Sequence, residues 1–155
     1  MLRKGTVADL FSGALTRAQG HIVVAMCLYP RGLSKAKRDE YCKALAPDRN
    51  LLDAFHAERE RLHGDHNAAF LTCGYQRRFT LSVNGVAELK RLAELSAARD
   101  VYLVCQCEAG QRCHRELLLI LAKRWWQAQT ELRTFSYPEF EKRIGDEPGS
   151  WLPIA

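Results

Sequence analysis

The sequence predicts a single small α/β domain with a mostly parallel sheet flanked by helices. Two short apolar runs, residues 21–28 and 101–104, lack the polar alternation of a half-exposed strand and are typical of strands buried on both faces. The second run leads through a short loop into an apolar helical stretch, residues 116–127. Strand, loop and buried helix together form the half-unit of an open α/β sheet. A length of 155 residues fits one domain, residues 1–155, in which residues 144–155 are expected to form a C-terminal tail.

Hydrophobic spacing places further helices around these strands. Ser34 is expected to cap a helix over residues 34–45, and Tyr29–Gly32 is expected to form the turn before it. Other helices are predicted at residues 51–62, 67–81, 86–95 and 139–143, whereas residues 1–20 give only a weak signal. The aromatic residues near the C-terminus are expected to close one side of the core; they are Trp125, Trp126, Phe135, Tyr137, Phe140 and Trp151.

Composition limits the classes of protein to consider. A hydrophobic fraction of 47% with a net charge of +5 is not the composition of a disordered chain. No apolar run approaches the roughly 20 residues of a membrane span, and no secretory signal pattern is visible, so we expect a cytoplasmic protein. The basic balance, with a pI of about 9.0, is compatible with a small anionic substrate, a phosphate group or a nucleic acid.

Three of the six cysteines, Cys105, Cys107 and Cys113, lie within nine residues of one another. A disulfide scaffold would instead spread its cysteines through a shorter, loop-rich chain, so we expect reduced thiols. Clustering of this kind indicates metal binding, redox chemistry or a catalytic thiolate. The other three are expected to be small core residues: Cys27, Cys42 and Cys73.

The loop that carries the cysteine cluster follows a strand and precedes a helix, which is where open α/β sheets bind their ligands. A helix N-terminus favours negative charge and can lower the pKa of a nearby thiol. Cys107 is the expected nucleophile, with Cys105 as the other candidate for the reactive thiol. Cys113 would serve as a resolving thiol and His114 as a proton shuttle.

The same loop offers groups for binding an anion. Gly110 would allow the loop to curl, and Arg112 and Arg115 would supply guanidinium donors. Arg31, in the turn after the first strand, is a further candidate for anion binding. His56, His63 and His66 lie among charged residues and are expected to face solvent.

No cofactor is predicted, although a structural zinc ion is the alternative use of the cluster. Its ligands would be Cys105, Cys107, Cys113 and His114, a set of soft donors that tetrahedral zinc accepts. The Cys-x-Cys spacing differs from the usual Cys-x-x-Cys clip, and in a continuing strand it would place successive side chains on opposite faces.

Two resemblances bear on the loop. Cys107-Glu108-Ala109-Gly110-Gln111-Arg112 resembles the Cys-x-x-Gly-x-Arg active loop of rhodanese sulfurtransferases. That resemblance implies a persulfide carried on Cys107 and an anion facing Arg112.

A broader resemblance covers most of the chain. It is similar to the bacterial and archaeal family called domain of unknown function 488, in which a strand ending in Leu-Cys is followed after seven residues by Cys-His-Arg. The matching positions are Tyr29-Pro30-Arg31-Gly32, Leu45-Ala46-Pro47-Asp48, Leu51-Leu52-x-x-Phe55, Val86-x-x-Leu89, Leu103-Val104-Cys105 and Cys113-His114-Arg115, with Phe70 and Tyr75 or Phe79 ahead of Val86. The resemblance implies a small α/β fold and places the family motif on Cys105, Cys113, His114 and Arg115.

Taken together, the sequence predicts a cytosolic protein with a Cys-His-Arg anion-binding loop and thiol-dependent, sulfurtransferase-like chemistry. As an enzyme it would be a cysteine-dependent transferase or hydrolase. Two alternatives stay open: a non-catalytic module that binds a nucleotide or nucleic-acid phosphate, and a structural zinc-binding domain.

Overall fold

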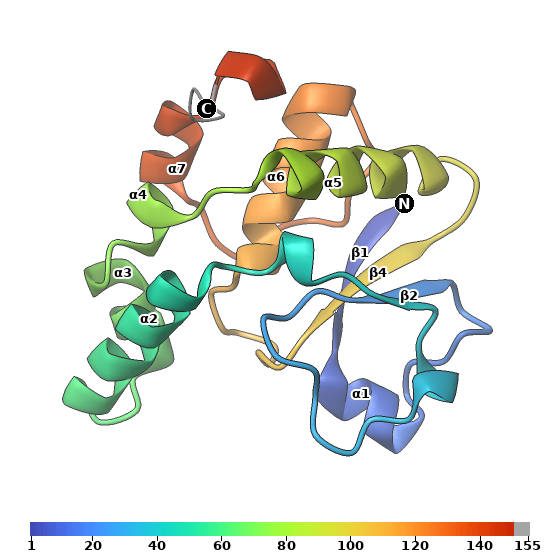
Figure 1. Ribbon diagram of the computed structural model, residues 1–155, viewed down its shortest axis with the longest axis horizontal. Helices are drawn as coiled ribbons and strands as arrows, with labels where there is room; N and C mark the ends of the chain where they lie inside the picture. The colour runs from blue at the N-terminus through green and yellow to red at the C-terminus, as the bar shows by residue number, and fades with distance from the viewer. Residues whose placement is uncertain (151–155) are drawn as a thin grey trace.

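The computed structural model describes residues 1–150 and is built on a four-stranded sheet in which all neighbouring strands are parallel (Figure 1). In spatial order the strands are β1 (Leu2–Thr6), β4 (Val101–Cys105), β2 (His21–Val24) and β3 (Glu40–Tyr41). The last strand in the sequence, β4, therefore lies between β1 and β2. In the register, Cys105 lies opposite Thr6, and Val104 lies opposite Val24. The predicted α/β class with a parallel sheet is confirmed.

Helices lie on both faces of this sheet. They are α1 (Val7–Ser12), α2 (Arg49–Arg61), α3 (His66–Thr72), α4 (Tyr75–Arg78), α5 (Val83–Leu95), α6 (His114–Trp126) and α7 (Pro138–Arg143), with 3₁₀ turns at Lys35–Lys37, Lys43–Leu45 and Pro148–Ser150. Figure 1 shows α5 and α6 over one face and α1 under the other, with α2 and α3 beside the carboxyl ends of the strands. None of the helices within residues 1–150 combines the length and the apolar character that a bilayer span requires.

Two apolar clusters fill the space between these layers. The larger one packs α5 and α6 against Val23 and Leu103, and the smaller one packs α1 against Ile22 and Val104. Neighbouring residues of β2 and β4 thus point into opposite clusters, so both strands are buried on both faces. This is the arrangement that their uninterrupted apolar runs predict.

Several predicted elements are confirmed. Helices α2, α5, α6 and α7 correspond to the stretches 51–62, 86–95, 116–127 and 139–143. Near the C-terminus, Trp125, Tyr137 and Phe140 are buried in the larger cluster and close that side of the core as expected. Trp151 and the rest of residues 151–155, part of the predicted tail, lie outside the described residues.

The predicted helix over residues 34–45 is wrong. Two 3₁₀ turns flank the short strand β3 in this segment. The Asp39 carboxylate accepts a hydrogen bond from the Ile22 backbone at 2.7 Å and forms an ion pair with Arg17. These contacts, distant in sequence, hold the segment extended beside β2 and override its helical spacing.

Two further expectations need correction. The predicted helix over residues 67–81 is split into α3 and α4, because Gly74 adopts a left-handed φ of 76° between them. Residues 1–20, which gave only a weak signal, contain β1 and α1. Strand β1 lies at the edge of the sheet, so Arg3 and Lys4 interrupt its apolar pattern.

Candidate functional site

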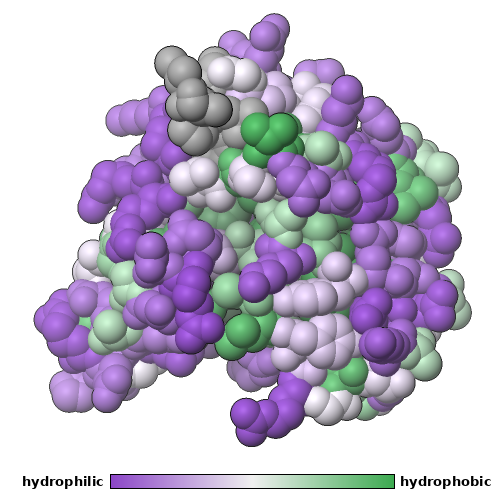
Figure 2. Space-filling view, viewed as in Figure 1, coloured by the Kyte–Doolittle hydropathy of each residue, from purple (hydrophilic) through white to green (hydrophobic). Residues whose placement is uncertain are grey.

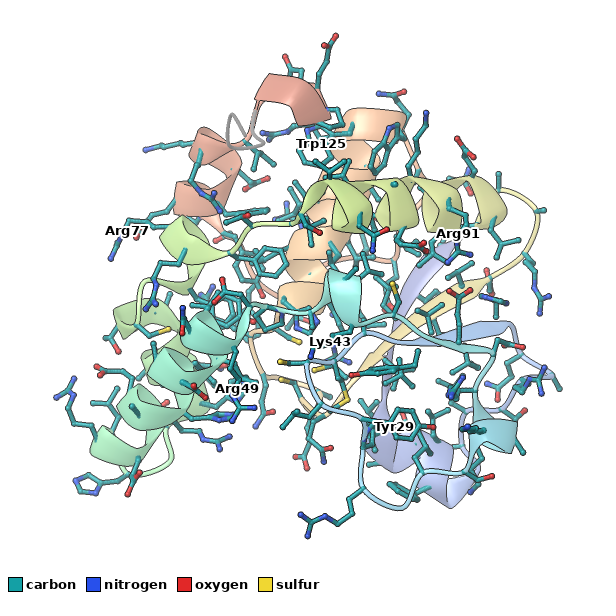
Figure 3. All side chains as sticks on the ribbon, viewed as in Figure 1. Tyr29, Lys43, Arg49, Arg77, Arg91 and Trp125 are labelled. Carbon is teal, nitrogen blue, oxygen red and sulfur yellow. The ribbon has the colours of Figure 1, made fainter. Side chains whose placement is uncertain are left out.

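The three clustered cysteines lie where β4 gives way to α6. Cys105 is the last residue of β4, Cys113 is the extended N-cap residue of α6, and residues 106–112 form the loop between them. Figure 3 shows sulfur atoms gathered in the region bordered by Arg49, Lys43 and Tyr29. This region lies beyond the carboxyl ends of β2 and β4, where parallel α/β sheets bind their ligands.

Helix α3 holds the loop in place. The side-chain amide of Asn67 donates to the Gly110 carbonyl at 3.0 Å, and its oxygen accepts from the Arg112 backbone N–H at 2.8 Å. The ring of His66 lies 2.8 Å from the Arg112 carbonyl. Gly110 has a left-handed φ of 81°, which allows the sharp turn within the loop.

Three of the seven backbone amides in the loop of residues 106–112 are occupied by contacts that hold its shape. The Glu108 N–H donates to the Gln111 side chain at 2.8 Å, and the Gln111 N–H donates to the Glu108 carbonyl at 3.2 Å. With the Arg112 N–H bound to Asn67, three amides after Cys107 already have acceptors. An amide cradle for an anion beside Cys107 would therefore have to use other N–H groups of the loop, such as those of Ala109 and Gly110.

Cys113 has a different environment. Arg115 donates from Nε to the Cys113 Sγ at 3.2 Å, and the Nδ1 of His114 lies 3.5 Å from the same sulfur. The other ring nitrogen of His114 lies 2.7 Å from the Ala25 carbonyl. Because a carbonyl oxygen can only accept, Nε2 carries the proton and Nδ1 is the atom that faces the thiol.

These contacts favour the thiolate form of Cys113. Burial alone would raise the pKa of the thiol, but hydrogen bonds from Cys105 and Cys107 and the charges of His114 and Arg115 outweigh it, so the pKa lies well below its usual value. The pKa of His114 moves in the opposite direction. Burial would lower it, but the negative charge on the neighbouring sulfurs raises it to about 10.

The neighbouring thiols form hydrogen bonds within the cluster. The Cys105 thiol donates to the Cys107 sulfur at 3.9 Å. Hydrogen bonds with Cys105 and Cys113, together with burial, raise the pKa of Cys107 far above its usual value. Close like charges cannot all form together, so one ionised sulfur keeps its neighbours protonated. In this cluster Cys113 is the preferred thiolate and Cys107 the thiol.

The predicted anion-binding residues are not all together. The Arg115 guanidinium is buried and donates to the carbonyls of Gly5 and Cys107 as well as to Cys113, and it does not line the cavity described below. Gly110 and Arg31 are exposed and also lie outside that lining. Of the four predicted residues, only Arg112 borders the cavity.

A cavity of about 280 Å³ opens onto the sulfur cluster. Loop residues Cys105, Cys107 and Cys113 form one wall, and residues of α2, α3 and α4 form the opposite wall. The second wall consists mainly of rings and basic groups, namely Phe55, His56, Arg59, His66, Phe70 and Tyr75. On this face of the molecule, Figure 2 shows apolar side chains in a recess between the α2 side and the sheet side. The clustered sulfurs therefore face a cavity rather than a closed core.

Sequence reasoning missed this second wall. Phe55 and Phe70 fit the helical apolar spacing of core residues, so nothing local distinguishes a cavity wall from packing. The expectation that His66 faces solvent is wrong, because its ring packs edge-on against Phe55 at 4.9 Å and holds the loop. Exposed His56 also lines the cavity.

The cluster also contains a set of potential metal ligands. One donor atom each from Cys105, Cys113 and His114 lie within 4.8 Å of one another, and the Cys107 sulfur lies beside that of Cys105. Soft sulfur and imidazole donors suit zinc. Arg115 already donates a hydrogen bond to the Cys113 sulfur. A zinc ion bound to that sulfur would therefore lie close to a second positive charge.

Fold and site together define a small parallel α/β protein with a Cys-His-Arg motif at the carboxyl end of its sheet. The chain belongs to the DUF488 family: residues 12–125 match DUF488-N3a, described as the active DUF488-N3 subclade. The resemblance noted in the sequence is thereby confirmed. Comparison with curated proteins and with solved structures gives no match.

Proposed function

We propose that this protein is a cysteine-dependent transferase whose nucleophile is the Cys113 thiolate and whose covalent intermediate forms in the cavity beside it. The observation that carries the proposal is the pair of contacts on the Cys113 sulfur. Arg115 is a donor-only partner at 3.2 Å, and His114 presents Nδ1 at 3.5 Å while Ala25 fixes its other nitrogen. Such contacts stabilise a nucleophilic sulfur.

The roles of the other residues follow from their positions. His114 would hold the proton taken from Cys113 and return it to that sulfur when the free thiol forms again. Cys107, kept protonated by its neighbours, would donate a hydrogen bond to the reacting sulfur. Arg112 would contact an anionic substrate at the edge of the cavity, and Arg115 would stabilise the thiolate rather than the substrate.

Sulfur transfer is the concrete reaction we propose. The Cys113 thiolate attacks the outer sulfur of thiosulfate, the sulfur–sulfur bond breaks, and sulfite leaves with its electron pair. This forms a persulfide on Cys113. Cyanide carbon then attacks the outer persulfide sulfur, thiocyanate leaves, and the Cys113 thiolate is regenerated. No oxidant or reductant is needed, because sulfur passes from one acceptor to the next with the charge conserved.

Peptide mass spectrometry after incubation with thiosulfate tests this proposal. We expect one added sulfur atom on Cys113, and thiocyanate after cyanide is supplied. The Cys113→Ala variant should lose both signals. Cys73→Ala is the matched control, since Cys73 is a free, partly exposed thiol outside the cavity lining, and it should keep both. Absence of sulfur on Cys113 with both thiosulfate and an aryl thiosulfonate as donors would overturn the proposal, as would an unaffected Cys113→Ala variant.

A zinc site is the second candidate, favoured by the closeness of Cys105, Cys113 and His114. Here Cys105, Cys107, Cys113 and His114 would bind the ion and the site would be structural. Stoichiometric zinc in purified protein, together with cysteines that resist alkylation until a chelator is added, would favour this candidate over the transferase.

We further propose that the protein works in a reducing compartment such as the cytoplasm. All six cysteines are free thiols in the structure, in keeping with the expectation from their spacing.

A further inference from the structure

The cavity beside the cysteines has a wall of aromatic rings. Phe70 and Tyr75 stack with centroids 4.1 Å apart, and Phe55 lies edge-on to both Tyr75 and His66. Rings held in this way present fixed faces and edges to the cavity, and they favour a planar, polarisable occupant over a fully hydrated ion.

Tyr75 also brings an unused polar group into this cavity. Its side chain is 4% exposed, yet its hydroxyl has no hydrogen-bond partner among residues 1–150. The hydroxyl oxygen is not a fully buried orphan, since Arg3 Nε alone has that status within residues 1–150, so it keeps some contact with the cavity or solvent. A polar group open to a cavity can bond a ligand there. Burial and the nearby sulfurs raise the pKa of the Tyr75 hydroxyl well above its usual value, so it remains a hydrogen-bond donor. The hydroxyl is therefore positioned to donate to an acceptor on a ligand.

Apart from the Cys113 thiolate, the charged side chains around the cavity are cationic. Arg59 and Arg112 contribute guanidinium groups, three histidines line the walls, and within residues 1–150 no Asp or Glu lines the cavity. Arg112 is held by the Ser136 carbonyl at 2.8 Å. Arg59 lies over the Phe55 ring at 5.6 Å and has no carboxylate partner among the described residues. An unpaired, half-exposed guanidinium beside an aromatic wall is suited to an incoming anion.

We propose that the cavity binds a planar aromatic anion whose anionic group pairs with Arg59 and whose distal acceptor atom receives a hydrogen bond from Tyr75. The ring of such a ligand lies against Phe55, Phe70 and Tyr75. Since Tyr75 is buried and Arg59 is half-exposed, the anionic group stays near the mouth and the acceptor reaches the thiols. This inference goes beyond the proposed function, because it assigns a class of ligand to the cavity that the Cys113 sulfur faces.

Calorimetric titration of the 155-residue protein with 4-acetylphenyl phosphate and phenyl phosphate tests each contact separately. The two ligands share a ring and a dianion, but only the first has a distal acceptor. Tyr75→Phe should weaken binding of 4-acetylphenyl phosphate by about tenfold and leave phenyl phosphate unchanged. Arg59→Gln should weaken both ligands by about tenfold or more. Arg61→Gln is the matched control, since Arg61 lies on the same helix, pairs with Glu58 and does not line the cavity.

Three outcomes would overturn the inference. The first is a failure of 4-acetylphenyl phosphate to bind with a dissociation constant below about 1 mM. The second is an affinity for cyclohexyl phosphate equal to that for phenyl phosphate. The third is an equal effect of Tyr75→Phe on the two aryl ligands. The titrations are repeated with Cys113→Ala, which retains the cavity walls but has no thiolate. Binding by this variant, combined with an unreactive Cys113 in the wild type, would leave the ligand inference standing while the proposed function fails. Sulfur transfer to Cys113 without any binding of the aryl anions would leave the proposed function standing while the ligand inference fails.

Discussion

Glu116→Gln tests how the start of α6, which carries the Cys-His-Arg motif, is fixed to the rest of the protein. The Glu116 carboxylate is 1% exposed and accepts from Lys4 Nζ at 2.7 Å, from the Thr134 N–H at 2.6 Å and from the Tyr137 hydroxyl at 2.6 Å. Glutamine keeps the shape but removes the charge, and its amide group must face one of these three donors. Breaking a buried ion pair costs about 3–5 kcal/mol. Because Lys4 retains 18% exposure, we expect the lower end, about 3 kcal/mol.

Thermal unfolding followed by circular dichroism measures this loss. For a domain of this size, about 3 kcal/mol corresponds to a midpoint roughly 6–12 °C lower at pH 7. The loss should depend on pH. Burial alone would raise the pKa of Glu116, but hydrogen bonds from Lys4, Tyr137 and Thr134 outweigh it and lower the pKa. The stabilisation is therefore complete above the unfolded value of about 4.3 and disappears as pH falls through the lower folded value.

The difference between the wild type and Glu116→Gln should accordingly shrink in acid. Glu94→Gln, at an exposed position on α5, is the control and should leave the midpoint unchanged at every pH. A Glu116→Gln midpoint equal to that of the wild type at pH 7, or a deficit that persists unchanged at pH 3 or below, would refute this account of how α6 is held.

Three other expectations concern the loop and the sulfur cluster. In Arg115→Lys the guanidinium that donates to the Cys113 sulfur and to two backbone carbonyls is replaced by a single ammonium group. The apparent pKa of alkylation at Cys113 should therefore rise by about 1 unit or more. An unchanged alkylation profile would contradict this. Asn67→Ala removes two hydrogen bonds to the loop, so trypsin should cleave after Arg112 about tenfold faster or more, and an unchanged cleavage rate would show that α3 does not hold the loop. Oxidation with diamide should link Cys107 to Cys105 or Cys113 in the wild type, and Cys107→Ala should abolish that linkage if the three sulfurs adjoin as described.

The sequence predicts those parts of the fold that depend on local pattern. The apolar runs of β2 and β4 and the periodicity of α2, α5 and α6 correspond to elements of the structure. Residues 34–45 do not follow their local pattern, because Asp39 bonds to Ile22 and Arg17, both more than fifteen residues away. Pattern alone contains no information about such distant partners.

In the site, too, local pattern predicts some features and distant contacts determine the others. Spacing identifies the cysteine cluster and the helix that follows it, but it does not order the thiols by reactivity. That order depends on Ala25, which fixes the ring of His114, and on Gly5, which helps to hold Arg115 beside Cys113. The aromatic wall is hidden for a related reason, since Phe55 and Tyr75 are spaced as core residues and meet the loop only after folding.

Site-resolved alkylation tests the central claim most directly, namely that Cys113 is the thiolate of the cluster. The protein is treated with a limiting amount of iodoacetamide across a range of pH, and each cysteine peptide is quantified by mass spectrometry. We expect Cys113 to be modified first, at a rate that is already maximal well below the ordinary thiol pKa of about 8.5. Preferential labelling of the partly exposed Cys73 or Cys107, or a rate at Cys113 that rises only near pH 8.5, would contradict it.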